Sequence, residues 1–132
     1  MMNSAKATIG IDKYKTTVTA GKNSIIVDEP EEKGGLDLGF HPQQLLAASL
    51  ASCTAITLKM YTDRKEWDIG PIDVEVDIEQ SEDKKETKFI RKISYKGNLD
   101  DKQKGRIEAI ANACPIHKIL LSQVTVETRV IA

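Results

Sequence analysis

Two cysteines are the residues in this chain that are best suited to chemistry. Cys53 lies in an apolar, alanine-rich run, and Cys114 comes directly before a proline. The thiolate is the strong soft nucleophile among the side chains, and two cysteines can close a disulfide that later opens. They lie far apart in the sequence, so only the fold can bring them together. If they meet, the chain is a redox protein; if they do not, each is a small buried hydrophobic residue.

Cys53 falls within a predicted long helix, from about His41 to Arg64. Pro42 suits the first helical position, and the residues that follow are helix formers, apolar or small on nearly every face. This pattern is typical of a central, buried helix. An apolar setting in mid-helix is expected to raise the pKa of the Cys53 thiol.

Cys114 lies where two shorter helices are predicted to meet. Capping residues over 98–101 precede a helix over about 101–113, and a proline is placed to begin a short helix over about 115–121. Cys114 is then at or near the N-cap, where unpaired backbone N–H groups stabilise a thiolate, with His117 one helical turn further on. Local sequence alone therefore makes Cys114 the more acidic thiol.

Antiparallel strands are predicted on both sides of the long helix. β-branched and turn residues indicate short strands over 5–28, and strict alternation indicates longer strands over 72–79 and about 87–96. The longer two carry acidic and basic outer faces, so they are expected to pair. The inner face of the second carries Phe89, Ile93 and Tyr95. The chain then forms one α+β domain: N-terminal strands and a glycine loop over 1–40, a central helix over 41–66, a β-hairpin over 71–97, two helices over 99–121 and a C-terminal strand over 123–131.

Composition excludes several classes of function. The 132 residues carry 19 Lys and Arg against 20 Asp and Glu, a net charge of −1, and only 5% are aromatic. Neither nucleic acid nor an anionic membrane surface is expected as a partner of such a chain. No secretory signal pattern is visible and the apolar stretch over 45–60 is short for a bilayer span, so a cytoplasmic location is expected. In a reducing compartment a disulfide is transient, either catalytic or sensing.

A helix that is apolar on every side is difficult to cover within one small domain. Either a curved sheet wraps it, or a homodimer buries it between two subunits. We favour the homodimer, although both arrangements are compatible with the residues.

Two motifs resemble those of the OsmC-like family, the osmotically inducible and organic hydroperoxide resistance proteins. Residues 41–54, HPQQLLAASLASCT, resemble the first cysteine motif, in which a proline, a polar residue and an apolar helix lead to the reactive cysteine. Residues 112–117, NACPIH, resemble the second, in which Cys-Pro opens a short helix. The strand end and glycine loop over 27–35 and the helix end over 59–67 follow the same order, so the resemblance covers nearly the whole chain.

The resemblance implies an OsmC-like fold: an intertwined homodimer with long central helices between antiparallel sheets and sites at the subunit interface. It also implies a thiol-dependent peroxidase for organic hydroperoxides, acting in oxidative-stress defence. Cys53 is then the peroxidatic thiolate, which becomes sulfenic acid, and Cys114 resolves it as a disulfide. A dithiol reductant such as a lipoyl group restores both thiols. No cofactor and no metal are expected.

The chain departs from the family's pattern at one charged pair. The peroxidases typically carry a glutamate ten residues before the reactive cysteine and an arginine in the N-terminal half. Here Gln43 stands at the glutamate position, and the first arginine is Arg64. The chain is therefore identified as a divergent member that lacks the usual Glu/Arg pair. Gln43, His41 and His117 are the residues expected to support the site, Gln43 through a hydrogen bond.

Two other functions are compatible with the residues. A non-catalytic OsmC-like dimer could bind a small apolar ligand in the same interface or sense oxidants by disulfide formation, and the missing charged pair favours it. Metal binding by Cys53, Cys114, His41 and His117 has suitable residue types for zinc, but the chain has no close ligand pair.

Overall fold

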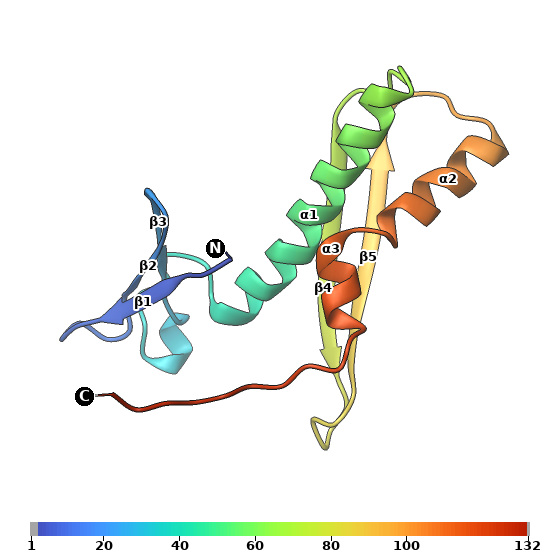
Figure 1. Ribbon diagram of the computed structural model, residues 1–132. Helices are drawn as coiled ribbons and strands as arrows, with labels where there is room; N and C mark the ends of the chain where they lie inside the picture. Colours follow the sequence, from blue (N-terminus) through green and yellow to red (C-terminus); the bar gives the residue numbers. More distant parts are fainter. Residues whose placement is uncertain (1–2, 132) are drawn as a thin grey trace. The chain divides into compact units, whose positions relative to one another are not determined.

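The computed structural model describes residues 3–131, which form two compact units over 3–46 and 47–131 (Figure 1). Groups of consecutive strands are followed by helices along these residues, and every paired strand is antiparallel to its neighbour. The predicted α+β class with antiparallel sheets is confirmed. The prediction of a single domain stays a prediction.

A three-stranded antiparallel sheet forms most of the first unit. β1 (Lys6–Ile9), β2 (Thr16–Ala20) and β3 (Asn23–Val27) lie in the order β1-β2-β3. Gly21 turns the chain between β2 and β3 with a φ of 60°, a left-handed conformation that glycine adopts without steric cost. A short 3-10 helix, η1 (Glu31–Lys33), lies within the predicted glycine loop. The short strands predicted for this part of the chain are confirmed.

The long helix α1 (Pro42–Arg64) lies within the predicted range of 41–66, but only one of its faces is buried. Its buried residues recur at every fourth position: Leu50, Thr54, Leu58 and Thr62. A spacing of four keeps side chains on one stripe of a helix. Ile56 and Met60 are 55% and 61% exposed. The prediction of a helix buried on every side is therefore wrong for the described chain, because its own elements cover a single face of α1.

By length and composition alone, α1 could also cross a membrane. It has 23 residues, and its mean hydropathy passes the usual threshold for a span. The apolar stretch over 45–60 is shorter than a span, but the helix continues beyond it at both ends. The core helix of a soluble protein passes the same test. Thr54 and Thr62, which are buried within the described chain, place hydroxyl groups on the stripe that packs against protein.

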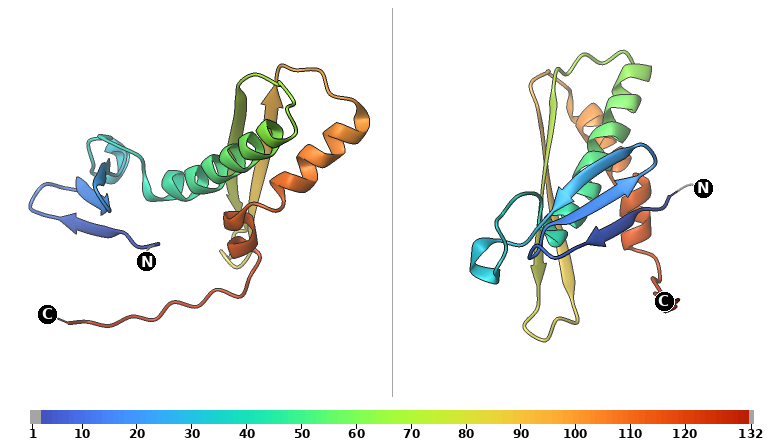
Figure 2. Two further views of the ribbon diagram at one scale, coloured as in Figure 1. Left: turned by 45° about the horizontal axis from the view of Figure 1, so that its top comes forward. Right: turned by 90° about the vertical axis from the view of Figure 1, so that its left-hand side faces the viewer.

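The hairpin of β4 (Ile72–Gln80) and β5 (Thr87–Tyr95) is the platform of the second unit. Glu75 lies opposite Lys92, so acidic and basic residues face each other across the outer ladder as predicted. The helices of this unit all lie on the other face of the hairpin (Figure 2). That inner face is therefore the one available to build both a core and a site.

Two short helices follow the hairpin, and local capping sets where each begins. α2 (Asp101–Ala111) starts at a capping box in which Asp100 and Gln103 exchange hydrogen bonds of 2.7 and 2.9 Å. It ends two residues before the predicted boundary. α3 (Pro115–Leu120) has a proline at its first position and Cys114 as its N-cap, as predicted.

The core of the second unit lies where α1, α2 and the hairpin meet. Leu58 of α1 is fully buried against Ile107 and Ala111 of α2. Partly buried apolar residues from the hairpin, its flanking loops and α2 surround this cluster: Trp67, Ile72, Ile93, Tyr95, Leu99 and Ile110. This packing holds the middle of α1 close to the end of α2, which is where Cys53 and Cys114 lie.

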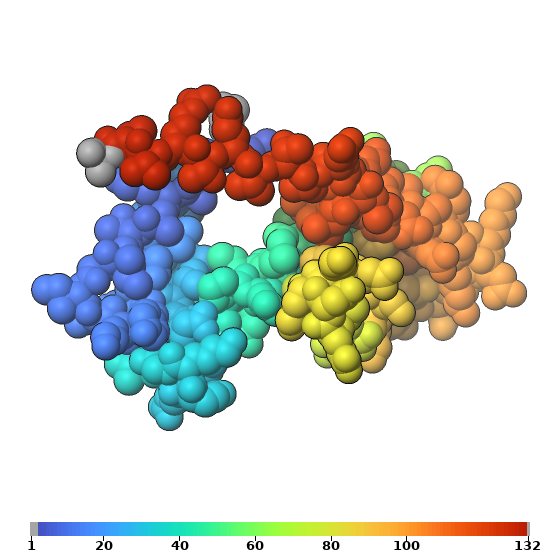
Figure 3. Space-filling view, turned by 90° about the horizontal axis from the view of Figure 1, so that it is seen from below, coloured from blue at the N-terminus to red at the C-terminus, as the bar shows by residue number. Residues whose placement is uncertain are grey.

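The predicted C-terminal strand over 123–131 is absent from the part of the chain that the structure describes. These residues are extended but pair with no other strand. A strand needs a neighbouring ladder for its backbone groups and a face to cover with its alternating side chains. Val126 and Val130 are 88% and 90% exposed, and the segment, red in Figure 3, is open to view on that side. The prediction is wrong for the single chain because the segment has no partner there.

Candidate active site at the paired cysteines

Cys53 and Cys114 lie side by side in the second unit. Cys53 is near the middle of α1, Cys114 caps α3, and their thiols are within hydrogen-bonding reach of each other. Both are free thiols in this structure. Cys114 is fully buried, whereas Cys53 is half-buried. The fold thus makes an adjacent dithiol in which Cys53 is the more accessible member.

Hydrogen-bond donors surround the sulfur of Cys114. The His117 backbone N–H donates to Sγ at 3.3 Å, and the Thr54 hydroxyl lies 3.9 Å from the same atom. Burial acts to raise the pKa of Cys114, but these donors, with the Cys53 thiol and the Ile116 N–H, outweigh it and hold the pKa below its ordinary value. Cys114 is therefore the more acidic thiol, as the local sequence predicts.

Cys53 has the opposite electrostatic balance. Burial raises the pKa of the Cys53 thiol, and the adjacent Cys114 raises it further. The Ile116 N–H and the Thr57 hydroxyl donate to the Cys53 sulfur and lower the pKa, but by less. The Cys53 thiol is therefore the weaker acid of the pair, and its hydrogen is the one that can be shared with the Cys114 sulfur.

Arg91 of β5 joins the site to its surroundings. Its guanidinium donates to Thr54 Oγ1 at 3.1 Å and to the carbonyl of Ala111 at 3.2 Å. It also donates to Asn112 Oδ1 at 2.7 Å and contacts His117 Nδ1 at 3.2 Å. A single cation thus ties α1, the end of α2 and α3 together around the dithiol.

Sequence reasoning missed Arg91, although the alternation of β5 contained the signal. The predicted inner face of this strand is Phe89, Ile93 and Tyr95, and position 91 falls on the same face. An arginine on an otherwise apolar face needs a cluster of acceptors there, because a buried guanidinium must be paired. The family's pattern predicts an arginine in the N-terminal half, whereas the one that reaches this site is in the hairpin.

His117 is connected to the Cys114 sulfur through its backbone N–H and to Arg91 through its ring. A guanidinium only donates, so Nδ1 of His117 accepts from Arg91 and carries no proton. Burial, helped by the Arg91 charge, lowers the pKa of His117. The ring is therefore neutral near pH 7. The predicted role of His117 in supporting Cys53 stays a prediction.

His41 and Gln43 lie in the first unit, at the start of α1. The His41 ring pairs with Asp37 at 2.8 Å, and its backbone N–H donates to Gln44 Oε1 at 2.9 Å. Gln43 is exposed. His41 thus has a local partner that explains its place at the helix start. Support of Cys53 by either residue stays a prediction.

The metal hypothesis does not fit the side chains that the structure describes. Among residues 3–131, no three His, Cys, Asp or Glu side chains lie close enough to hold an ion. His41 pairs with Asp37, and the ring of His117 pairs with Arg91. The two cysteines therefore form a dithiol rather than half of a four-ligand site.

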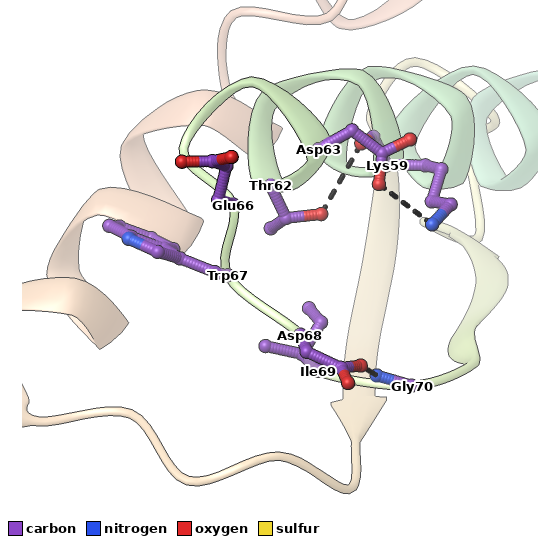
Figure 4. Close-up of a pocket in the computed structure, with 8 residues that line it drawn as sticks. All are labelled: Lys59, Thr62, Asp63, Glu66, Trp67, Asp68, Ile69 and Gly70. Atoms are coloured by element: carbon purple, nitrogen blue, oxygen red, sulfur yellow. Dashed lines mark hydrogen bonds and ion pairs between the residues drawn. The ribbon is translucent and has the colours of Figure 1, made fainter.

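A polar hollow of about 360 Å³ lies at the far end of α1 and contains neither cysteine (Figure 4). Lys59, the first cation along the chain after Cys53, lines it and pairs with Asp63 at 2.8 Å. Its ammonium group is thus occupied by a neighbour on the next helical turn. Lys59 does not take the place of the missing charge.

A family model matches the part of the chain that carries both cysteines. The model for OsmC-like proteins matches residues 33–129, which include both cysteine motifs. The chain belongs to the OsmC-like protein family. The matched range extends from the glycine loop into the exposed C-terminal segment, so it covers parts of both units.

Solved structures of OsmC-like proteins share the fold. A protein of Psychrobacter arcticus 273-4, described as an osmotic stress induced and detoxification response protein, is 30% identical, with a TM-score of 0.77 over 90% of this chain and 88% of that one. The OsmC-like protein of Mycoplasma pneumoniae is 22% identical, with a TM-score of 0.69 over 89% and 85%. The organic hydroperoxide resistance protein OhrB of Bacillus subtilis is 22% identical, with a TM-score of 0.60 over 89% of each chain. No curated protein sequence matches the chain.

Proposed function

We propose that this OsmC-like protein is a thiol-dependent peroxidase that reduces organic hydroperoxides through Cys53 and Cys114. The observation that carries the proposal is the adjacent pair of free thiols, one half-buried and one fully buried. A peroxide can approach the half-buried sulfur, while the buried sulfur is sheltered from unrelated oxidants and stands ready to close the disulfide. The apolar residues of α1 around Cys53 suit an alkyl tail.

The proposed cycle begins with the proton that Cys53 shares with Cys114. As this proton passes to Cys114, the Cys53 thiolate attacks the distal peroxide oxygen, and the O–O bond breaks. Cys53 becomes sulfenic acid, and the departing alkoxide takes the proton from Cys114 to leave as the alcohol. The Ile116 N–H and the Thr57 hydroxyl, which donate to Cys53, stabilise its thiolate during the attack.

The second half of the cycle closes and reopens a disulfide. The Cys114 thiolate attacks the Cys53 sulfur, an S–S bond forms, the S–O bond breaks, and hydroxide leaves as water after taking a proton from solvent. The dithiol has then lost two electrons to the peroxide. An external dithiol, such as a lipoyl group, returns two electrons and two protons by thiol–disulfide exchange.

We further propose that the protein works as a homodimer in the cytoplasm. Ile56 and Met60 leave an apolar face of α1 exposed, and the apolar residues of the 123–131 segment are exposed as well. A second copy that covers these surfaces would complete the burial that the sequence predicts for α1.

The test is a thiol count after the reduced protein meets one equivalent of cumene hydroperoxide. We expect both thiols to be lost rapidly, with a Cys53–Cys114 disulfide found by mass spectrometry. Cys114→Ser should accumulate sulfenic acid at Cys53, and Cys53→Ser should retain its thiol. If both thiols of the natural protein survive at the rate of free cysteine, the proposal is wrong.

A second candidate, oxidant sensing without turnover, is favoured by the raised pKa of Cys53. A thiol that keeps its proton reacts slowly with peroxide. The same experiment separates the two functions when a dithiol reductant and excess peroxide are added. Continuous peroxide consumption supports the peroxidase, whereas a single oxidation that is not followed by re-reduction supports the sensor.

A further inference from the structure

We infer that Arg91 is a positioning residue that stabilises the Cys114 thiolate through the hydroxyl group of Thr54. Arg91 lies on β5, Thr54 on α1 directly after Cys53, and Cys114 at the start of α3. The use of this contact in a peroxide cycle rests on the proposed function. The effect on the thiolate does not, because it is a property of the reduced protein alone.

The direction of the hydrogen bonds is set by what each group can do. The guanidinium of Arg91 has five donors and no acceptor, so at 3.1 Å it must donate to Thr54 Oγ1. The single hydroxyl hydrogen of Thr54 is then free to point elsewhere. Oγ1 lies 2.7 Å from the carbonyl oxygen of Leu50 and 3.9 Å from Cys114 Sγ. One hydrogen can serve only one of these acceptors at a time.

The ionisation of Cys114 decides which acceptor the hydroxyl chooses. A neutral thiol is a weak acceptor, so the hydroxyl donates to the Leu50 carbonyl, as Ser and Thr side chains commonly do in helices. A thiolate is a far stronger acceptor, and the hydroxyl can turn to it. The donation from Arg91 polarises the O–H group and strengthens this second bond.

Burial increases the effect of the contact between Thr54 and Cys114 on the stability of the thiolate. Thr54 and Cys114 are both 0% exposed, so water does not solvate the sulfur of a thiolate formed there. The titratable and charged groups near this sulfur are Cys53 on α1, His117 on α3 and, through Thr54, Arg91 on β5. His117 is neutral because its Nδ1 accepts from Arg91, and Cys53 holds its proton. Arg91 is therefore the cation that this buried anion can use.

The other bonds of Arg91 keep this geometry in place. Its contacts with the Ala111 carbonyl and with Asn112 Oδ1 hold the residues just before Cys114, and its contact with His117 holds the first turn of α3. Cys114, the N-cap of α3, is thus held in place by contacts with the residues before it and after it. In the proposed cycle, loss of Arg91 should slow the attack of Cys114 on the sulfenic acid more than the formation of that acid.

The experiment is a thiolate titration by absorbance at 240 nm in a Cys53→Ser background, where Cys114 is the single thiol. We expect Arg91→Gln and Thr54→Val each to raise the pKa of Cys114 by about one unit, which is about tenfold less thiolate at a given pH. Thr54→Ser keeps the hydroxyl, so the pKa of Cys114 should equal that of the Cys53→Ser background. Arg91→Lys keeps the charge and should rescue part of the shift. Lys92→Gln removes a cation from the outer face of β5 and is the matched control, with no shift expected.

The double variant Arg91→Gln, Thr54→Val separates a relayed effect from a direct one. If Arg91 acts through Thr54, the pKa of Cys114 in the double variant is no higher than in Thr54→Val alone. Full additivity of the two shifts, or no shift in either single variant, would overturn the inference. If Arg91→Gln does not fold, Arg91→Lys and Thr54→Val still test it. Because no peroxide is used, a protein that fails the thiol count with cumene hydroperoxide can still pass this test.

Discussion

Asp28 in the first unit and Cys114 in the second are both buried acidic groups that accept hydrogen bonds from backbone N–H groups. The Asp28 carboxylate is 2% exposed and takes four such bonds, two on each oxygen, at 2.8 to 3.3 Å. Its donors are Tyr14, Glu29, Leu36 and Leu38. Burial acts to raise the pKa of Asp28, but the four N–H groups outweigh it and lower the pKa below its ordinary value.

The two sites differ in how completely the acidic group is satisfied. Asp28 is saturated by Tyr14 and by three N–H groups of its own loop. Gly35 packs so closely on this loop that an added Cβ would collide with the Glu29 carbonyl and lie 2.8 Å from Asp28 Oδ1. Cys114 has a backbone donor at 3.3 Å, a weaker one from Ile116, a distant hydroxyl and a second thiol. A saturated anion organises a loop, whereas a partly satisfied sulfur beside another sulfur can react.

The largest effect should come from Leu58→Ala, which removes core packing beneath the dithiol. Leu58 is 0% exposed, so the variant should lower the free energy of unfolding by about 2–5 kcal/mol. Urea unfolding followed by the fluorescence of Trp67, the single tryptophan, measures it. The yield of disulfide with peroxide should fall. The amides of Leu36 and Leu38, in the loop that Asp28 holds, should keep their protection from hydrogen exchange. Ile56→Ala, at a residue that is 55% exposed, is the control, and a loss as large as that of Leu58→Ala would show that a partner covers this face.

An intermediate effect is expected in the loop that Asp28 holds when the pH is lowered. Because the pKa of Asp28 is lower in the folded chain than in the unfolded one, its stabilisation is complete above the unfolded pKa and is lost as the pH falls through the folded value. Amide exchange at Leu36 and Leu38, expressed as protection factors, should drop across that acidic range. Asp28→Asn offers one acceptor oxygen in place of two, so these amides should lose protection at every pH. Asp12→Asn, at an exposed carboxylate, is the control; if both variants behave alike, the loop is not held by Asp28.

The smallest effect is expected from Lys59→Gln. Its ion pair with Asp63 is exposed and is formed within one helical turn, and such pairs add little to stability. Neither the rate of peroxide-driven disulfide formation nor the titration of Cys114 should change. A slower reaction of Cys53 in this variant would show that the lysine does supply the charge missing from the first motif.

Elements with strong local signals were predicted well from the sequence. Pro42 and Pro115 mark the first residues of two helices, and Asp100 with Gln103 marks the start of a third, because proline geometry and capping act over a few neighbouring residues. The lower pKa of Cys114 could be predicted for the same reason: its main backbone donor, His117, is three residues away.

Other features depend on groups that are distant in the sequence. The alternation of β5 identified its inner face but not what Arg91 would meet there. The stretch over 123–131 alternates like a strand, yet a strand also requires a partner, and the described chain supplies none. An apolar pattern likewise shows that α1 can be buried without showing which of its faces this chain covers.

The sequence by itself determined where the helices begin, which strands pair in the hairpin, and that Cys114 caps a helix. These follow from backbone geometry, capping and alternation, which act between residues close in the chain. Only the tertiary structure decided that Cys53 reaches Cys114, that Thr54 stands between Arg91 and the buried sulfur, and that one face of α1 stays exposed. Those contacts join elements far apart in the sequence, and packing in the core around Leu58 sets their distances.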